Sequence, residues 1–366
     1  MRGAGLLLLG AALACAQPAA PVRFETSTVR SGIGRPADVA IADVDGDRHP
    51  DLLVADAAGR AVVLLRGDGR GGFAPGEGWP VPLPIAPHLV GAGPGFVAAT
   101  GHDGNDVFVI PTRAGMPSRP QSFQAIAGVA PHNHGLAIAD FDGDGRADLA
   151  TSNNNGNSVS VLLSATDGRF APAPGSPFPV GRAPYPLAVA DFDLDGRADV
   201  ATPDVQGDTI TVLRGDGHGS FAPAPGSPYR VEPRPFFVRA ARVNGDRAPD
   251  LVVSHDDVST VTVLVNDGRG QFPERRTFDA GGRTWKIGAA DFDGDGRIDL
   301  AMGVAPRSLA IFSGDGAGGF RRASGMPVPV GNGPWGVVVG DVNGDGRTDV
   351  VTANTDEGTL TVLLAK

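Results

Sequence analysis

The sequence DFDGDGRAD, residues 140–148, is one of six copies of an acidic nonapeptide. The copies begin at Asp43, Asp140, Asp191, Arg242, Asp291 and Asp341. Successive starts from Asp140 onward differ by 51, 51, 49 and 50 residues, while the first gap is 97 residues, which is two periods with one copy missing. A fixed period of this length is typical of a repeat architecture. Seven repeats of this kind fill the chain.

Each repeat contains four segments with the character of β-strands. Short apolar segments flank the nonapeptide, for example LAIA before Asp140 and DLATS from Asp148 onward. A β-branched segment such as SVSVLLS follows, and a glycine-rich turn with an aromatic residue, such as GDGHGSF, introduces the fourth segment. Alternation with a period of two, bounded by turn residues, is the signal of strands. Seven four-stranded units predict an all-β fold, a seven-bladed β-propeller.

The two ends of the chain predict how the ring closes. The seventh repeat stops at Lys366, directly after its third strand. The segment 22–29, VRFETSTV, carries Phe24 where the other repeats have the aromatic residue of their fourth strand. We therefore expect this N-terminal segment to pair with the last blade, which would cover the exposed edge of that sheet.

Two repeats depart from the pattern. In the second repeat the sequence GAGPGF, residues 91–96, replaces the acidic loop with a tight turn, so this blade is expected to hold no metal. In the fifth repeat Arg242 occupies position 1 of the nonapeptide. A guanidinium cannot ligate a cation, and we expect Arg242 to reach into the loop and form an ion pair in place of one.

The first sixteen residues, MRGAGLLLLGAALACA, combine one Arg, an apolar run and small residues, which is typical of a signal peptide at residues 1–16. Cleavage after Ala16 would remove Cys15, the only cysteine. Alternatively, Cys15 is the lipid-bearing N-terminus of a bacterial lipoprotein, although Ala12 stands where that signal usually has Leu. Export predicts a secreted, periplasmic or cell-surface propeller of residues 22–366. No later apolar run approaches the roughly eighteen residues that span a bilayer.

The formal net charge of −10 argues against a nucleic-acid partner, because the chain has no basic stripe. Of the 41 acidic residues, 21 lie in the six nonapeptides. Five bound divalent cations would therefore bring the protein close to neutrality.

The acidic nonapeptides have the donor set of calcium sites. Side-chain oxygens at positions 1, 3, 5 and 9, with Gly usually at position 6, can wrap a cation that takes six to eight oxygen ligands at about 2.3–2.6 Å. The absence of His and Cys from these positions argues against zinc and copper, and magnesium prefers to keep several waters. We expect Ca²⁺ in about five sites, with these ligands: Asp43, Asp45, Asp47, Asp51, Asp140, Asp142, Asp144, Asp148, Asp191, Asp193, Asp195, Asp199, Asp291, Asp293, Asp295, Asp299, Asp341, Asn343, Asp345 and Asp349.

Two other interpretations of the acidic loop are weaker. The DxD and DxDG patterns occur in sugar-nucleotide transferases and in phosphatases with an aspartyl nucleophile, but six copies in equivalent hairpins disfavour catalysis. The aspartates could also cap a turn without metal. Mutual repulsion of four acids within nine residues disfavours that interpretation for the five complete copies.

The loop, the DL or DV strand after it and the GDGxGxF segment resemble the FG-GAP, or VCBS, repeats of integrin-α-like propellers. The resemblance covers essentially the whole chain after the signal peptide. It implies calcium in the hairpin between the first and second strands of a blade, and ligands on the opposite face. It also implies a function in adhesion, carbohydrate binding or assembly, although some members with enlarged loops are polysaccharide lyases.

The residues six positions before each acidic loop, at the start of the innermost strand, are Ala37, His134, Tyr185, Phe236, Trp285 and Trp335, with His88 as the counterpart in the second repeat. They should surround the ring axis on the face opposite the calcium loops. The side chains could pack between blades, since position −6 has the same strand parity as the larger residues at −4 and −2. Alternatively, His134, Tyr185, Phe236, Trp285 and Trp335 bind a ligand, with polar contacts from Asn133 and Lys286.

Known catalytic motifs such as GxSxG, HExxH and a phosphate loop do not occur in the sequence. Seven histidines are scattered through the chain, and residues 132–134, HNH, contain the only local pair. We expect a non-catalytic binding, adhesion or scaffold module with an extracellular protein or glycan as partner. The alternatives are a lectin-like propeller and, less favoured, a polysaccharide-active enzyme.

Overall fold

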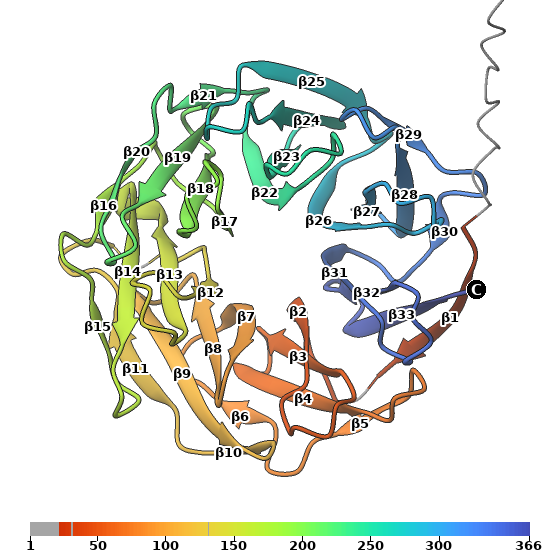
Figure 1. Cartoon of the computed structure of the whole chain (residues 1–366). Helices are drawn as coiled ribbons and strands as arrows, with labels where there is room; N and C mark the ends of the chain where they lie inside the picture. Colours follow the sequence, from red (N-terminus) through yellow and green to blue (C-terminus); the bar gives the residue numbers. More distant parts are fainter. Residues whose placement is uncertain (1–21, 31, 131) are drawn as a thin grey trace, which may run out of the picture.

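The computed structural model describes residues 22–30, 32–130 and 132–366. Figure 1 shows seven small antiparallel sheets arranged as blades around a common axis, and this confirms the predicted seven-bladed β-propeller. The predicted signal peptide and Cys15 lie outside the described residues. In the part of the chain that the structure describes, no helix is both long and apolar enough to cross a bilayer.

Each blade has four antiparallel strand positions, counted from the axis outward. The innermost strands are β2 (Pro36–Ala42), β7 (Pro87–Gly93), β12 (Ala137–Ala139), β17 (Ala188–Ala190), β22 (Pro235–Ala241), β26 (Thr284–Ala290) and β31 (Pro334–Gly340). The second strands are β3 (Asp51–Asp56), β8 (Phe96–Gly101), β13 (Asp148–Asn153), β18 (Asp199–Asp204), β23 (Asp250–His255), β27 (Asp299–Val304) and β32 (Asp349–Asn354). The third strands are β4 (Ala61–Gly67), β9 (Asp106–Arg113), β14 (Ser158–Ser164), β19 (Thr209–Gly215), β24 (Thr260–Val265), β28 (Ser308–Gly314) and β33 (Thr359–Ala365).

The outermost position is a single strand in two blades and two short segments in the other five. The single strands are β1 (Phe24–Val29) and β25 (Glu274–Asp279). The divided ones are β5 (Phe73–Pro75) with β6 (Val81–Pro82), β10 (Met116–Pro117) with β11 (Gln121–Gln124), β15 (Phe170–Pro172) with β16 (Phe178–Pro179), β20 (Phe221–Pro223) with β21 (Tyr229–Arg230), and β29 (Phe320–Arg322) with β30 (Val328–Pro329). A 3₁₀-helix, η1 (Asn154–Gly156), follows β13.

The hydrophobic core lies between the blades. The described residues form seven apolar clusters, and each cluster joins two neighbouring blades. Between the first and second blades, for example, Leu53 and Val62 pack with Val97 and Ile110, and all four side chains are almost wholly buried. Six of the seven second strands are buried along their whole length, as in β3, and β8 is buried except at Phe96. Each blade therefore depends on its neighbours to bury both of its faces.

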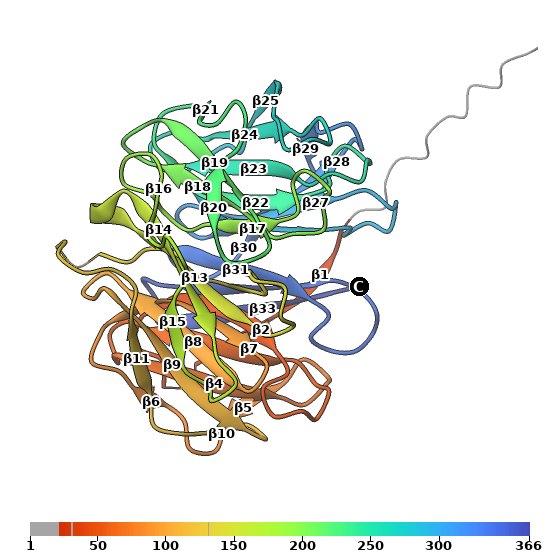
Figure 2. The ribbon, with the colours of Figure 1, turned by 60° about the vertical axis from the view of Figure 1, so that its left-hand side comes forward.

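The N-terminal segment closes the ring as predicted. Strand β1 pairs antiparallel with β33, in register from Phe24 opposite Ala365 to Val29 opposite Leu360. Figures 1 and 2 both show β1 beside β33, at the end of the chain. The N–H of Lys366 extends the pairing by donating a hydrogen bond to the carbonyl of Arg23, at 3.0 Å. The edge of β33 is thus covered, so the last blade offers no free third strand to another sheet.

The second blade has the expected tight turn. Only Pro94 and Gly95 separate β7 from β8. Gly95 has a φ of +78°, which only glycine adopts at little cost, and its carbonyl accepts a hydrogen bond of 2.8 Å from the N–H of Thr112. These two residues replace the eight residues that separate the first and second strands in the other blades.

Candidate functional site

The acidic loops connect the first and second strands of their blades. In the third blade both oxygens of Asp140, at position 1, accept hydrogen bonds from loop N–H groups: Oδ1 from Gly143 at 2.7 Å and Oδ2 from Gly145 at 2.8 Å. The same two contacts are made by Asp43, Asp291 and Asp341. The backbone therefore curls around the position-1 carboxylate.

Four of the loops bring three carboxylates together. Oxygens of the three side chains lie within 4.8 Å of one another in the groups Asp43–Asp45–Asp51, Asp140–Asp142–Asp148, Asp191–Asp193–Asp199 and Asp291–Asp293–Asp295. Two oxygens on one calcium ion are at most about 5.2 Å apart, so these groups have the spacing of a calcium shell. In the seventh blade, where Asn343 stands at position 3, the described carboxylates form no such group.

One buried oxygen at position 3 supports the fit of a cation. Asp193 and Asp293 each keep a carboxylate oxygen that is shielded from solvent and accepts no hydrogen bond, Oδ1 and Oδ2 respectively. An unpaired buried oxygen costs about 1–3 kcal/mol, and a bound cation would remove that cost. The residues present therefore fit calcium at these positions, with hard oxygen donors and no competing nitrogen or sulfur.

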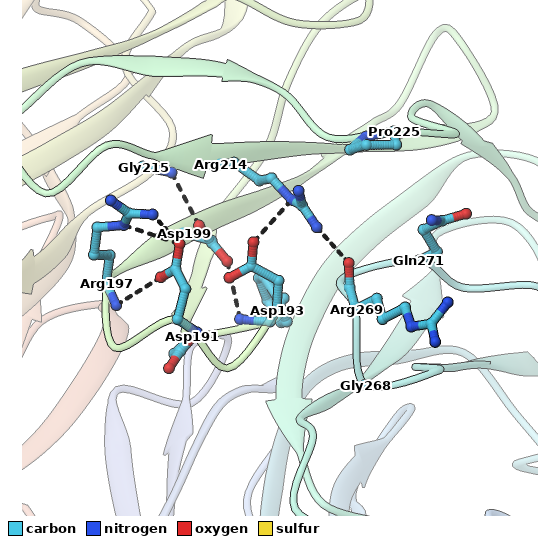
Figure 3. A network of polar contacts seen from close by, with 12 residues as sticks. Asp191, Asp193, Arg197, Asp199, Arg214, Gly215, Pro225, Gly268, Arg269 and Gln271 are labelled. Carbon is cyan, nitrogen blue, oxygen red and sulfur yellow. Dashed lines mark hydrogen bonds and ion pairs between the residues drawn. The ribbon is translucent and has the colours of Figure 1, made fainter.

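Arginines pair with loop carboxylates at positions 3 and 5. Figure 3 shows this network in the fourth blade, where Arg214 contacts Asp193 at 3.1 Å and donates to the carbonyl of Arg269 in the next blade. Arg197 pairs with Asp195 at position 5. The position-5 acids Asp47, Asp144 and Asp295 likewise pair with arginines. These ion pairs offset part of the repulsion among the loop acids, and a cation would compete with them for the oxygens at positions 3 and 5.

The aspartate at position 9 has a second role that the sequence pattern did not reveal. In all six loops this side chain is fully buried, one oxygen accepts the N–H of position 2, and the other accepts an N–H at the end of the third strand, at 2.7–3.0 Å. We call this arrangement the position-9 clamp, formed by Asp51, Asp148, Asp199, Asp250, Asp299 and Asp349. Burial raises the pKa of all six carboxyls, to about 6 at Asp199, Asp250 and Asp299.

The expectation for Arg242 is wrong. Its side chain is exposed, and among the described residues it makes no ion pair with an acid of its loop. The available carboxylates are already used: Asp250 clamps the N–H groups of Val243 and Asn266, and Asp246 accepts a 2.8 Å hydrogen bond from the amide of Asn244. The fifth loop is thus held closed by hydrogen bonds alone, and the clamp persists where position 1 has no acid.

The residues at position −6 lie at the start of the innermost strands or, for His134 and Tyr185, three residues before them, on the face opposite the acidic loops. We call this face the mouth. Tyr185 links two of them: its ring stacks on His134 at 3.7 Å between centroids and lies 4.9 Å from the ring of Phe236. Trp285 and Trp335 form a separate stacked pair at 5.2 Å. The structure therefore brings five of these side chains into two aromatic groups.

Burial divides these aromatic side chains. His134 and Trp285 are 2% and 7% exposed, so they pack between blades, whereas Tyr185, Phe236 and Trp335 remain partly exposed. The expectation that these side chains share the strand parity of positions −4 and −2 is wrong. The register of five innermost strands shifts at position −6, for example between Pro334 and Gly336. The β-bulge inserts one residue and re-aims the side chain at position −6.

Ion pairs surround the mouth. Lys286 of β26 contacts Asp38 of β2 at 2.6 Å and so joins the sixth blade to the first past the intervening blade. Asp38 is 2% exposed. On the rim, Asp256 pairs with Arg234 and Arg283, and the guanidinium of Arg283 lies 5.7 Å from the ring centroid of Trp285. Lys286 is therefore engaged within the protein, and Asn133, the other predicted polar contact, is wholly buried.

The comparisons with solved structures show similar folds at low sequence identity. BBS1N, solved in complex with ARL6DN, aligns with a TM-score of 0.65 at 13% identity, covering 94% of this chain and 97% of that one. A lectin from Agrocybe aegerita that recognises non-reducing terminal N-acetylglucosamine has a TM-score of 0.59 at 16% identity, covering 94% and 96%. A candidate 6-phosphogluconolactonase from Bacteroides uniformis has a TM-score of 0.64 at 13% identity, covering 82% and 88%. No curated protein sequence matches the chain.

The family comparison matches the repeats themselves. A model of the FG-GAP-like repeat matches residues 140–202, 242–302 and 301–352. Each matched stretch begins at or near an acidic loop or the strand that follows one, and the seven blades repeat the same hairpin geometry around the ring. The chain is a seven-bladed β-propeller that contains FG-GAP-like repeats.

Proposed function

We propose that the protein is an exported, calcium-stabilised propeller that acts as a non-catalytic binding module and takes its ligand at the mouth. The observation that carries this proposal is the gathering of aromatic side chains at the mouth, with Tyr185, Phe236 and Trp335 still partly exposed. Export is supported by the N-terminal sequence, and calcium by the convergent carboxylates of the loops.

Calcium has a structural role in this proposal. The acidic loops lie at the ends of the innermost strands opposite the mouth, so an ion bound there does not contact a ligand at the mouth. Each ion would bind carboxylates at positions 1 and 3, together with position 9 in the first, third and fourth blades and position 5 in the sixth. It would thereby fix the innermost strand next to the mouth residues. Calcium would thus affect ligand binding at the mouth indirectly, by keeping the blades rigid.

The mouth has both an aromatic surface and a cavity. Trp335 lines a cavity of about 300 Å³ together with His88, His102, Arg35 and Asp103. A volume of this order is at the lower end for small-ligand sites. Aromatic faces beside charged groups suit a ligand with one apolar face and several polar groups.

A glycan is the ligand class that this combination favours, and a protein partner is the second candidate. A sugar ring can stack its C–H face on Trp335 while its hydroxyls contact Arg35 or Asp103. The lectin from Agrocybe aegerita shows that a propeller of this overall fold can bind a sugar. BBS1N, which was solved with a protein partner, shows the other possibility.

A glycan array distinguishes the two candidates. We expect the mature, calcium-loaded protein to bind one class of glycan. The Trp335→Ala variant should bind it about two- to ten-fold more weakly, because stacking on an aromatic face contributes about 0.5–1.5 kcal/mol. Trp335→Phe, which keeps an aromatic face, is the matched control and should retain most of the binding. Silence across the array would favour a protein partner, and unchanged binding by Trp335→Ala would place the site away from the mouth.

A further inference from the structure

Four of the seven histidines form one cluster at the mouth, on the boundary between the second and third blades. His88 lies in the bulge of β7, His102 lies in the turn after β8, and His132 and His134 precede β12. The ring centroids of His88 and His102 are 4.0 Å apart, and those of His102 and His134 are 4.2 Å apart. His132 lies 4.9 Å from His102. A ring nitrogen of each of His88, His102 and His134 lies within 4.8 Å of the other two.

The buried members of the cluster have polar atoms without partners. His134 is 2% exposed, and its Nδ1 is shielded from solvent without a hydrogen bond. The Nε2 of His132 is likewise shielded from solvent without a hydrogen bond. Both amide atoms of Asn133, which is wholly buried, also lack a partner. Buried polar groups are nearly always satisfied, so this concentration of unpaired atoms in one place indicates a missing ligand.

We propose that His88, His102 and His134 form a binding site for a divalent transition metal, of which Zn²⁺ is the best fit. Imidazole nitrogen is a preferred ligand of zinc, copper and nickel, whereas calcium takes oxygen. Three nitrogens around a tetrahedral zinc at 2.0–2.1 Å are about 3.4 Å apart, so small side-chain rotations bring the observed nitrogens into that geometry. The site is therefore separate from the acidic loops in both its chemistry and its face of the ring.

A cavity adjoins two of the three histidines. His88 and His102 line the cavity of about 300 Å³ that also contains Arg35, Asp103 and Trp335. His132 can supply a fourth nitrogen, or the fourth coordination position can stay open to water, as three protein ligands leave it in other zinc sites. The metal site does not depend on the proposed glycan ligand, because its ligands all come from the chain itself.

Metal titration of the folded protein tests this site. Calcium in excess keeps the acidic loops supplied, and Zn²⁺ is then added in a calorimeter. We expect one equivalent of zinc to bind, and Co²⁺ in its place to give the visible absorption of a low-coordinate nitrogen site. His102→Gln should weaken zinc binding at least roughly ten-fold, because it removes one of the three ligands; loss of a supporting residue alone costs about 10–100-fold.

Two controls make the result decisive. His102 is exposed, so its substitution leaves the core intact, and an unchanged melting temperature of the metal-free variant checks the fold. His218→Gln alters an exposed histidine outside the cluster and should bind zinc like the unmodified protein. Absence of zinc binding, or zinc binding that His102→Gln leaves unchanged, would overturn the proposal and show that these imidazoles only stack on one another.

Discussion

Removal of calcium should lower the melting temperature of the propeller by about 10–20 °C. Extracellular calcium modules bind with dissociation constants of about 0.1–1 mM, so 10 mM calcium stabilises each site by about 1.4–2.7 kcal/mol. Five sites together give roughly 7–14 kcal/mol, and for a chain of this length 1 kcal/mol shifts the melting temperature by about 1–2 °C. The carboxylates of Asp140, Asp142 and Asp148 illustrate the cause, since without the ion three converging charges repel one another.

Scanning calorimetry in 10 mM calcium and in excess chelator measures this shift. Magnesium at the same concentration is the matched control, and it should restore only a small part of the stability because it retains its water shell. Equal melting temperatures with calcium and with chelator would show that the acidic loops are turns held by hydrogen bonds alone.

The Asp250→Ala variant should lose about 2–4 kcal/mol of unfolding free energy at pH 7.5, with or without calcium. Both oxygens of Asp250 accept backbone N–H groups, from Val243 at 3.0 Å and from Asn266 at 2.9 Å. The residues that donate are buried, so alanine leaves two unsatisfied donors. The fifth loop has Arg242 at position 1 and is not expected to bind metal. The loss of unfolding free energy therefore measures the contribution of the position-9 clamp alone.

Urea unfolding followed by fluorescence measures the loss. Asp246→Ala is the matched control in the same loop: Asp246 is exposed, so loss of its hydrogen bond from Asn244 should cost much less than loss of the buried clamp. Asp199→Ala, in a complete loop, should lose the clamp and also the calcium-dependent part of the stability. An Asp250→Ala variant as stable as the Asp246→Ala variant would show that the clamp contributes nothing.

The fold could be predicted because its information is periodic along the chain. The same four segments recur at a spacing of about fifty residues, and Phe24 occupies the place of a fourth-strand aromatic, so both the blade count and the pairing of β1 with β33 follow from local patterns. The tight turn at Pro94 and Gly95 was predictable for the same reason, because it stands where the repeat spacing places an acidic loop.

The details of the sites depend on contacts between segments that the sequence does not place together. His88 and His134 are 46 residues apart, and only the packing of the second blade on the third brings their rings within 4.9 Å. The bulges re-aim the side chains at position −6, and no residue type marks a bulge reliably. One signal was available in the sequence: Asp250 is retained in the loop where Arg242 replaces the position-1 acid, which points to a role for position 9 beyond metal binding.

The number of calcium ions bound per chain tests the central claim most directly. Equilibrium dialysis against buffer with 10 mM calcium, followed by elemental analysis, gives that number for the mature protein. The account predicts about five ions, one for each complete acidic loop, and one fewer in the Asp191→Ala variant. The Arg242→Ala variant should bind the same number as the unmodified protein, because the fifth loop has only two carboxylates. A protein that binds no calcium would contradict the account.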